Sequence, residues 1–294
     1  MISGDIQRIC VIGAGTMGSQ IAQQCALHGY DVRLTDEDPA QLDAARRSNS
    51  KHLARRVEKA RMTREEAEQA GDRVRTTVDR NEALDGAGFV IEAVVERLDI
   101  KRALFAELDR TADPSAILAT NSSTIGISQI AADLPHAERC INMHFFHPVL
   151  VMKLVEVMRG PQTSDRAVDL TMELSRRIGK DPVLINREVY GLLVNRILGA
   201  IKREAFWLAE EGYASPQDID RAVKLGLNHP MGPFELSDFS GLDVFYYAAL
   251  QRFQETGDEQ HRPPRILQKK VEAGELGRKT GKGFYEYPAE GGVD

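Results

Sequence analysis

The sequence contains few cysteines, and their spacing pairs none of them. Cys10, Cys25 and Cys140 stand singly in apolar stretches, and the chain has no Cys-x-x-Cys motif. A chain that depended on disulfides or on thiolate metal ligands would show paired or clustered cysteines. We therefore expect the three to be small core residues of a protein in a reducing compartment.

Long apolar runs are also missing. None approaches the roughly 18 residues that a membrane-spanning helix needs. The first residues, Met1–Asp5, lack the basic and apolar regions of a signal peptide. The sequence thus predicts a cytoplasmic protein that does not interact with a membrane.

Positive charge is not in excess, and no metal-ligand pattern is present. The 38 Lys and Arg residues are outnumbered by 44 Asp and Glu residues, which gives a formal net charge of -6 and argues against a nucleic-acid partner. The histidines show no spacing, to one another or to the cysteines, that is typical of a metal site. With 42% hydrophobic and 28% charged residues, the 294-residue chain has a globular composition and a length suited to one large or two ordinary domains.

The first part of the chain has the pattern of an α/β fold. Short apolar runs of strand length recur, and helical segments separate several of them. The runs are Ile9–Ile12, Val32–Asp36, Phe89–Val95, Ile117–Thr120, Ile141–Phe145, Leu154–Met158 and Val183–Ile185. This alternation predicts a Rossmann-type, doubly wound sheet. Residues 38–70 are charged and helical in character, with a capping-box pattern from Thr63 to Glu66.

Helical periodicity replaces the strand pattern after about residue 186. Helices are predicted over 191–211, 215–226, 233–239, 242–255 and 264–273. Strand-like alternation returns only in the short segment 283–287. We therefore predict an α/β domain over residues 1–186 and an all-α domain over residues 187–294.

A glycine-rich turn follows the first apolar run and opens a helical stretch. The turn reads Gly13-Ala14-Gly15-Thr16-Met17-Gly18. Gly13 permits the tight turn, Gly15 lets the backbone approach a pyrophosphate on the helix N-terminus, and Gly18 allows helix and strand to pack closely. Asp36 ends the next apolar run, where its carboxylate would bind ribose hydroxyls and repel a 2′-phosphate. These residues predict that the domain over residues 1–186 is an NAD-binding domain, and they favour NAD over NADP.

His144 and Glu156 form the candidate catalytic pair. Oxidation of an alcohol by hydride transfer needs a base that removes the hydroxyl proton. His144 ends one apolar run, Pro148 interrupts the chain, and a second run contains Glu156. A carboxylate among apolar neighbours needs a partner, and His144 can supply it while Glu156 orients the ring. Two plainer interpretations stay open: a solvent-facing Glu156 on an edge strand, and a hydrogen-bonded core histidine.

These motifs, with others along nearly the whole chain, resemble the L-3-hydroxyacyl-CoA dehydrogenases, and most of all the short bacterial 3-hydroxybutyryl-CoA dehydrogenases. The resemblance is carried by Gly13–Gly18, Ile91–Glu96 with Lys101, Asn121–Thr124, His144–Val157, Val194–Arg196, His229–Leu236 and Gly277–Tyr285. Motifs this numerous, in this order, are specific to the family.

The resemblance implies roles for individual residues. His144 would be the base, Glu156 its orienting partner, Ser123 a residue between substrate and nicotinamide, and Asn195 a hydrogen-bond partner of the thioester. Cofactor contacts beyond the glycine turn would come from Asp36, Glu96, Lys101, Ser123, His147 and Lys279.

The resemblance also implies the role of whole segments. The helical C-terminal domain would close over the acyl group and form a homodimer interface. The charged stretch after Asp36 would cover the CoA, with Lys51 and Lys59 as substrate-binding candidates beside Arg55 and Arg56. A basic, solvated helix face is an equally good interpretation of these four residues.

Two positions depart from the family pattern. His147 stands where the family usually has Asn, so a ring nitrogen would replace an amide near the cofactor. Tyr190-Gly191 stands where Pro-Gly is usual, so a proline does not fix that turn. Neither departure changes His144, Glu156, Ser123 or Asn195.

The sequence thus predicts an NAD-dependent dehydrogenase that interconverts a short-chain 3-hydroxyacyl-CoA, such as 3-hydroxybutyryl-CoA, with its 3-oxoacyl form. Three alternatives remain: a carrier-protein thioester as substrate, a free β-hydroxy acid as substrate, and a non-catalytic NAD-binding protein. Enzymes that act on free β-hydroxy acids use a catalytic lysine, which the His144–Glu156 segment argues against.

Overall fold

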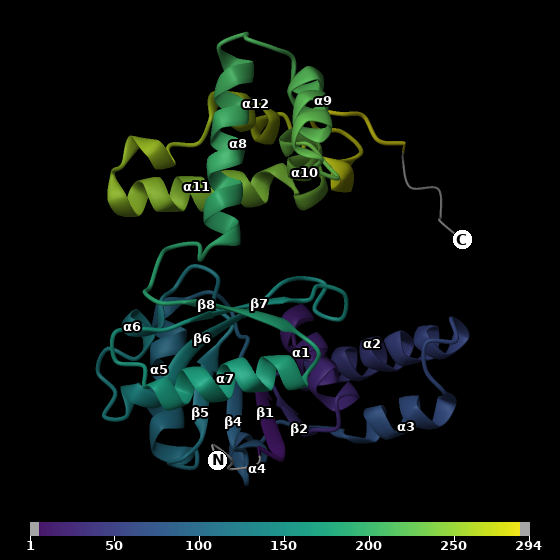
Figure 1. The fold of residues 1–294 in the computed structure, drawn as a ribbon, viewed down its shortest axis with the longest axis vertical. Helices are drawn as coiled ribbons and strands as arrows, with labels where there is room; N and C mark the ends of the chain where they lie inside the picture. The colour runs from purple at the N-terminus through teal and green to yellow at the C-terminus, as the bar shows by residue number, and fades with distance from the viewer. Residues whose placement is uncertain (1–5, 289–294) are drawn as a thin grey trace. The chain divides into compact units, whose positions relative to one another are not determined.

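The computed structural model describes residues 6–288, and the chain divides into two compact units between Leu193 and Val194 (Figure 1). The first unit is an α/β layer structure and the second is helical. The sequence places the domain boundary at residues 186 and 187, where the segment that connects β8 to the first helix of the second unit begins.

An eight-stranded sheet forms the centre of the first unit. Its strands are β1 (Arg8–Ile12), β2 (Asp31–Thr35), β3 (Val74–Thr77), β4 (Phe89–Glu92), β5 (Ile117–Thr120), β6 (Cys140–Phe145), β7 (Leu154–Met158) and β8 (Asp181–Ile185). They lie in the order β3-β2-β1-β4-β5-β6-β7-β8, and each neighbouring pair is parallel except β6 and β7. The doubly wound topology predicted from the sequence is confirmed.

The β3 strand was not predicted. It pairs with β2 at the edge of the sheet, and its side chains are half-buried or exposed. A strand with such a weak apolar signal is easily missed when the evidence is a run of buried residues.

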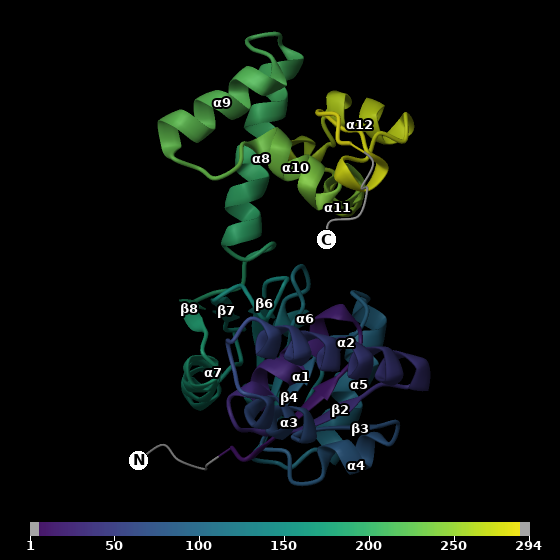
Figure 2. The same cartoon turned by 90° about the vertical axis from the view of Figure 1, so that its right-hand side faces the viewer.

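Helices cover both faces of the sheet (Figures 1 and 2). One face packs against α1 (Thr16–Leu27), α2 (Pro39–Glu58) and α7 (Asp165–Arg177), and the other against α4 (Arg80–Leu84), α5 (Leu98–Thr111) and α6 (Ile127–Ile130). Successive β4 residues alternate between these two cores, with Ile91 in the first and Val90 in the second. The three cysteines are free and buried, as core residues would be.

The helix α3 (Arg64–Asp72) packs beside α2 and forms a helical hairpin with it (Figure 1). The capping box predicted at its start is confirmed: Glu66 N donates to Thr63 Oγ1 over 3.1 Å, and Thr63 N donates to Glu66 Oε2 over 2.7 Å. These bonds satisfy two of the orphan donors at the helix start.

The second unit is built from five α-helices within the described residues. They are α8 (Val194–Glu210), α9 (Pro216–Leu227), α10 (Pro233–Ser240), α11 (Leu242–Thr256) and α12 (Arg265–Glu272). Short 3-10 turns occur in this unit at η2 (Glu259–His261) and η3 (Arg278–Thr280). The first unit contains the 3-10 turn η1 (Ala137–Arg139). Three aromatic rings, Phe206, Phe234 and Phe284, contact one another in its core. The all-α character predicted for this part is confirmed.

No regular strand forms over residues 283–287. An isolated bridge instead joins Glu286 to Lys282, just before the segment. Its backbone is held by the buried carboxylate of Asp238, which accepts from Phe284 N over 3.0 Å and from Tyr285 N over 2.9 Å. These hydrogen bonds go to a side chain, so the segment needs no partner strand.

The first helix of the second unit begins at Val194, three residues later than predicted. Gly191 and Leu192 adopt positive φ angles of 76° and 52°, which turn the chain before the helix starts. Among residues 6–288, no helix combines the length and apolar character that crossing a bilayer requires.

Candidate active site

The three glycines of the turn after β1 meet two physical needs, close packing and open space. A Cβ on Gly13 would lie 2.6 Å from Ala93 O, and a Cβ on Gly18 would lie 1.8 Å from Gly13 O. Both positions therefore need glycine for packing. A Cβ on Gly15 would meet nothing within 4 Å, so this glycine leaves open space beside the start of α1.

That open space has the features of an anion site. The first helical hydrogen bond runs from Ser19 N to Gly15 O over 3.0 Å, so the N–H groups at the start of α1 are free of helical acceptors. Asp36 lies directly after β2. Its Oδ2 accepts a hydrogen bond from Ala14 N over 2.7 Å, and its Oδ1 accepts one from Asp38 N over 3.0 Å. A pyrophosphate on the helix end and a ribose beside Asp36 fit these groups.

A second group of polar residues lies beyond the ends of β4 and β5. Glu96 Oε1 accepts from Ser122 Oγ over 2.6 Å, from Ser123 N over 3.1 Å and from Thr124 N over 3.0 Å. Burial opposes ionisation of Glu96, but the Ser122 hydroxyl, the Lys101 charge and the Thr124 groups outweigh it and lower the pKa of this carboxyl. Glu96 therefore fixes the turn that carries Ser123.

Lys101 lies below this turn in a fully buried ion pair. Its Nζ is 2.6 Å from Glu92 Oε1 and 3.3 Å from Glu96 Oε2, and the side chains of Lys101 and Glu92 are 1% and 0% exposed. Glu92 Oε2 also accepts a hydrogen bond from the Thr120 hydroxyl over 2.6 Å. Lys101 is thus placed to hold Glu96, while its contact with a cofactor stays a prediction.

His144 and Glu156 lie opposite each other on β6 and β7. They are register partners in the antiparallel pairing, and His144 Nδ1 is 3.0 Å from Glu156 Oε2. The side chains are 8% and 1% exposed. The Phe146 ring packs against the imidazole in an edge-type arrangement, with ring centroids 4.7 Å apart. Glu156 is therefore a buried, partnered carboxylate and not a solvent-facing one.

This contact sets the orientation of the imidazole. A carboxylate can only accept, so it selects the tautomer with the proton on Nδ1. The Nε2 atom is then left as the acceptor, which is the state that a general base requires.

The sequence matches the NAD-binding domain of 3-hydroxyacyl-CoA dehydrogenase over residues 8–189 and the C-terminal domain of the same enzyme over residues 191–287. The chain belongs to the 3-hydroxyacyl-CoA dehydrogenase family. Its first unit is therefore the NAD-binding domain of this family.

Individual relatives agree with the family. A probable 3-hydroxybutyryl-CoA dehydrogenase of Bacillus subtilis is 42% identical over 283 residues, which cover 96% of this chain and 98% of that protein. A 3-hydroxyadipyl-CoA dehydrogenase of Escherichia coli is 39% identical, covering 97% of this chain and 60% of that protein. The crystal structure of (S)-3-hydroxybutyryl-CoA dehydrogenase from Ralstonia eutropha matches with a TM-score of 0.91 at 38% identity, covering 97% of this chain and all 100% of that one.

The remaining family positions are mostly exposed side chains. His147 is exposed after β6, and Lys51 and Lys59 are exposed on or at the end of α2. In the second unit, Asn195 is the exposed second residue of α8, and Lys279 Nζ lies 2.6 Å from the carboxylate of Asp243. The cofactor and CoA contacts expected of these residues stay predictions.

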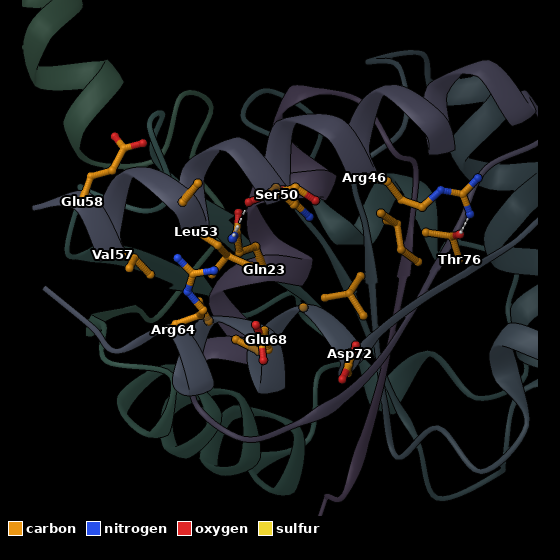
Figure 3. Close-up of a pocket in the computed structure, with 17 residues that line it drawn as sticks. Gln23, Arg46, Ser50, Leu53, Val57, Glu58, Arg64, Glu68, Asp72 and Thr76 are labelled. Carbon is orange, nitrogen blue, oxygen red and sulfur yellow. Dashed lines mark hydrogen bonds between the residues drawn. The ribbon is translucent and has the colours of Figure 1, made fainter. Parts of the chain in front are cut away.

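A hollow of about 810 Å³ lies between α2, α3 and the β2–β3 edge (Figure 3). Apolar residues such as Leu53 and Val57 line it, and Arg46, Arg64 and Glu68 stand around it. None of the candidate site residues of this dehydrogenase family is among its lining residues. The hollow is therefore separate from the candidate active site.

Two features of the site were missed by sequence reasoning. Glu92 belongs to a motif of the family resemblance but received no role, although a carboxylate within an apolar run is the same signal that identified Glu156. The backbone N–H of Leu193 donates to Glu156 Oε1 over 3.0 Å, and a backbone donor leaves no trace in the sequence. Across residues 6–288, no cluster of three or more His, Cys, Asp or Glu residues suits a metal ion.

Proposed function

We propose that this family member interconverts short-chain 3-hydroxyacyl-CoA and 3-oxoacyl-CoA with NAD(H), using His144 as the base. The observation that carries the proposal is the buried contact of 3.0 Å between His144 Nδ1 and Glu156 Oε2, in a unit that also holds the dinucleotide turn. Bound NAD would accept the hydride that leaves C3 of the 3-hydroxyacyl substrate.

The proton steps follow from the side chains of the chain itself. His144 Nε2 removes the proton of the 3-hydroxyl group, and Glu156 stabilises the imidazolium that results. In the reverse direction, the imidazolium returns that proton to the oxygen of the 3-oxo group. Glu96 and the turn it fixes hold Ser123 in one place, which suits a residue that contacts both substrate and nicotinamide.

The relatives support a CoA thioester as substrate, because their names include 3-hydroxybutyryl-CoA and 3-hydroxyadipyl-CoA. In this proposal, Asn195 binds the thioester side, and Lys51 and Lys59 bind CoA phosphates. Lys279 and His147 add cofactor contacts.

A free β-hydroxy acid is the rival substrate, and it would call for a catalytic lysine. The two buried lysines described in the first unit are engaged elsewhere: Lys101 with Glu92, and Lys180 with the carbonyls of Val149 and, over 2.9 Å, Met152. Neither buried lysine of the first unit is therefore placed for that role, which supports the histidine chemistry in this unit.

The deciding experiment follows NADH absorbance with 3-oxobutyryl-CoA, longer 3-oxoacyl-CoAs, the carrier-protein thioester and free acetoacetate. We expect turnover to be fastest with the short CoA thioester, and faster with NADH than with NADPH. Preference for the carrier thioester would shift the substrate class. No turnover with any of these substrates, in a protein that still binds NADH, would favour a non-catalytic role.

We further propose a cytoplasmic homodimer formed through the helical unit. Free, buried cysteines suit a reducing compartment. Several large apolar side chains of the helical unit are exposed in the single chain, among them Ile197, Leu225, Val244 and Tyr247. Light scattering after size exclusion tests this, and a monomeric mass at micromolar concentration would contradict it.

A further inference from the structure

The segment between β8 and α8 is fixed to the sheet by side chains and backbone. At its start, the Glu188 carboxylate accepts from Ser128 N over 2.7 Å and from the Ser128 hydroxyl. In its middle, Val189 N lies 3.4 Å from Met158 Sδ. We call residues 186–193 the linker. Its contacts show that it is a positioned segment of the first unit.

The end of the linker turns sharply. Gly191 has a φ of 76°, and Leu192 has a φ of 52°, a left-handed conformation that side chains rarely adopt. Leu192 is nevertheless kept there, because its side chain is 1% exposed among Met158 and Ile185 and its N–H donates to Val189 O over 3.1 Å. Strained backbone of this kind persists where surrounding contacts impose it, often beside a functional site.

The turn directs the next N–H at the candidate catalytic carboxylate. Leu193 N donates to Glu156 Oε1 over 3.0 Å, while Glu156 Oε2 lies 3.0 Å from His144 Nδ1. The two carboxylate oxygens thus have separate tasks. Because both oxygens are held, the plane of the carboxylate is fixed. The orientation of the imidazole that Oε2 contacts is then fixed as well.

From these contacts we infer that the Leu193 N–H is a positioning group for the catalytic base, acting through Glu156. The inference rests on the proposed function of His144. Loss of this donor weakens the hold on Glu156 Oε1, and with it the fixed orientation of the imidazole.

The sharpest test replaces the Leu193 amide by an ester, through incorporation of the α-hydroxy analogue of leucine. This change removes one N–H and leaves the side chain intact. We expect kcat to fall by about tenfold or more, as for loss of a hydrogen bond to a charged group. The acid limb of the kcat/KM profile should move to higher pH. A carboxylate that accepts one hydrogen bond fewer stabilises the imidazolium charge more strongly, so the proton is lost only at higher pH.

The matched control is the same ester at Leu192. Its N–H donates to Val189 O and not to Glu156, so the linker loses a hydrogen bond but the base keeps its support. We expect the acid limb to stay in place for this variant. Equal shifts in both ester variants would mean that the linker acts only through stability, and would overturn the inference.

A substrate-independent readout separates this inference from the proposed function. The ¹⁵N shifts of the His144 ring report its tautomer in the absence of any acyl-CoA. We expect the Nδ1–H form in the parent protein and a mixture of tautomers in the Leu193 ester. If the parent is inactive with every substrate yet the tautomer changes, the proposed function fails and the positioning stands. If the tautomer and the pH profile are both unchanged in a folded Leu193 ester, the inference is wrong.

Discussion

His144 and Glu156 are directly opposite each other across the one antiparallel pairing of the eight described strands. In such a pairing, opposite residues point to the same face with their Cβ atoms about 5 Å apart. The reversal of direction at β7 thus brings an acid beside an imidazole, with both residues on strands. The geometry therefore rests on sheet register, one of the most strongly specified features of a buried fold.

Replacing His144 with Gln should remove the base. We expect turnover to fall by about 10²–10⁴-fold, the usual cost of deleting a positioned base. NADH binding, measured by fluorescence titration, should change little because the glycine turn is untouched. Near-parental turnover would mean that another group takes the proton.

Replacing Glu156 with Gln or Ala separates its two contacts. Gln can still accept the Leu193 N–H through its oxygen, but its NH2 group then faces His144 Nδ1 and favours the wrong tautomer. We expect kcat to fall severely in both variants, and acyl-CoA KM to rise more in Ala than in Gln. The His144→Gln/Glu156→Gln double variant should lose little more than the worse single variant, because the pair acts as a unit. Multiplicative losses would contradict this.

Replacing Gly15 and Gly18 with Ala should give opposite outcomes. A Cβ at Gly18 would lie 1.8 Å from Gly13 O, so Gly18→Ala should lower the unfolding temperature sharply. A Cβ at Gly15 meets no protein atom, so Gly15→Ala should fold normally and yet lose NADH affinity by about tenfold or more through obstruction of the pyrophosphate. Calorimetry and NADH titration measure the two effects. Normal NADH affinity in Gly15→Ala would place the cofactor elsewhere.

Replacing Glu92 with Gln should weaken the support beneath Ser123. It leaves Lys101 buried with a single carboxylate, and breaking a buried pair typically costs about 3–5 kcal/mol. Urea unfolding should show this loss, and the Glu92→Gln/Lys101→Met double variant should recover part of it. A free energy of unfolding equal to that of the parent would show that Glu96 alone suffices for Lys101.

Replacing Lys202 with Met should make stability less dependent on pH. Burial lowers the pKa of Lys202 to about 8; its side chain lies under the Phe245 ring, with Nζ 5.2 Å from the centroid. An unfolded lysine titrates near 10.4. The unfolded chain therefore binds more protons between these values, so stability rises with pH there and the cost of burial is complete below about pH 8.

Lys202→Met should thus be more stable than the parent at pH 7, by about 3 kcal/mol, and the gain should shrink toward pH 10. Urea unfolding at both pH values measures it. Lys224→Met is the control, because Lys224 is 40% exposed and paired with Glu235. A gain that is the same at both pH values would show that packing, and not charge, is responsible.

The sequence by itself determined the α/β fold class, the glycine turn with Asp36, and the pairing of His144 with Glu156. Each of these rests on local chemistry: a turn that needs glycine, an apolar run of strand length, a carboxylate that cannot be buried alone. Such signals are contained in a few adjacent residues and their spacing.

Only the tertiary structure decided the rest. Lys101 is buried beneath the Ser123 turn because two strand ends and α5 meet there, which no local pattern reveals. The linker turn delays α8 to Val194 because contacts with β7 and β8 impose a left-handed Leu192. The Leu193 N–H is a donor that nearly every residue has, so only the folded chain shows which carboxylate it meets.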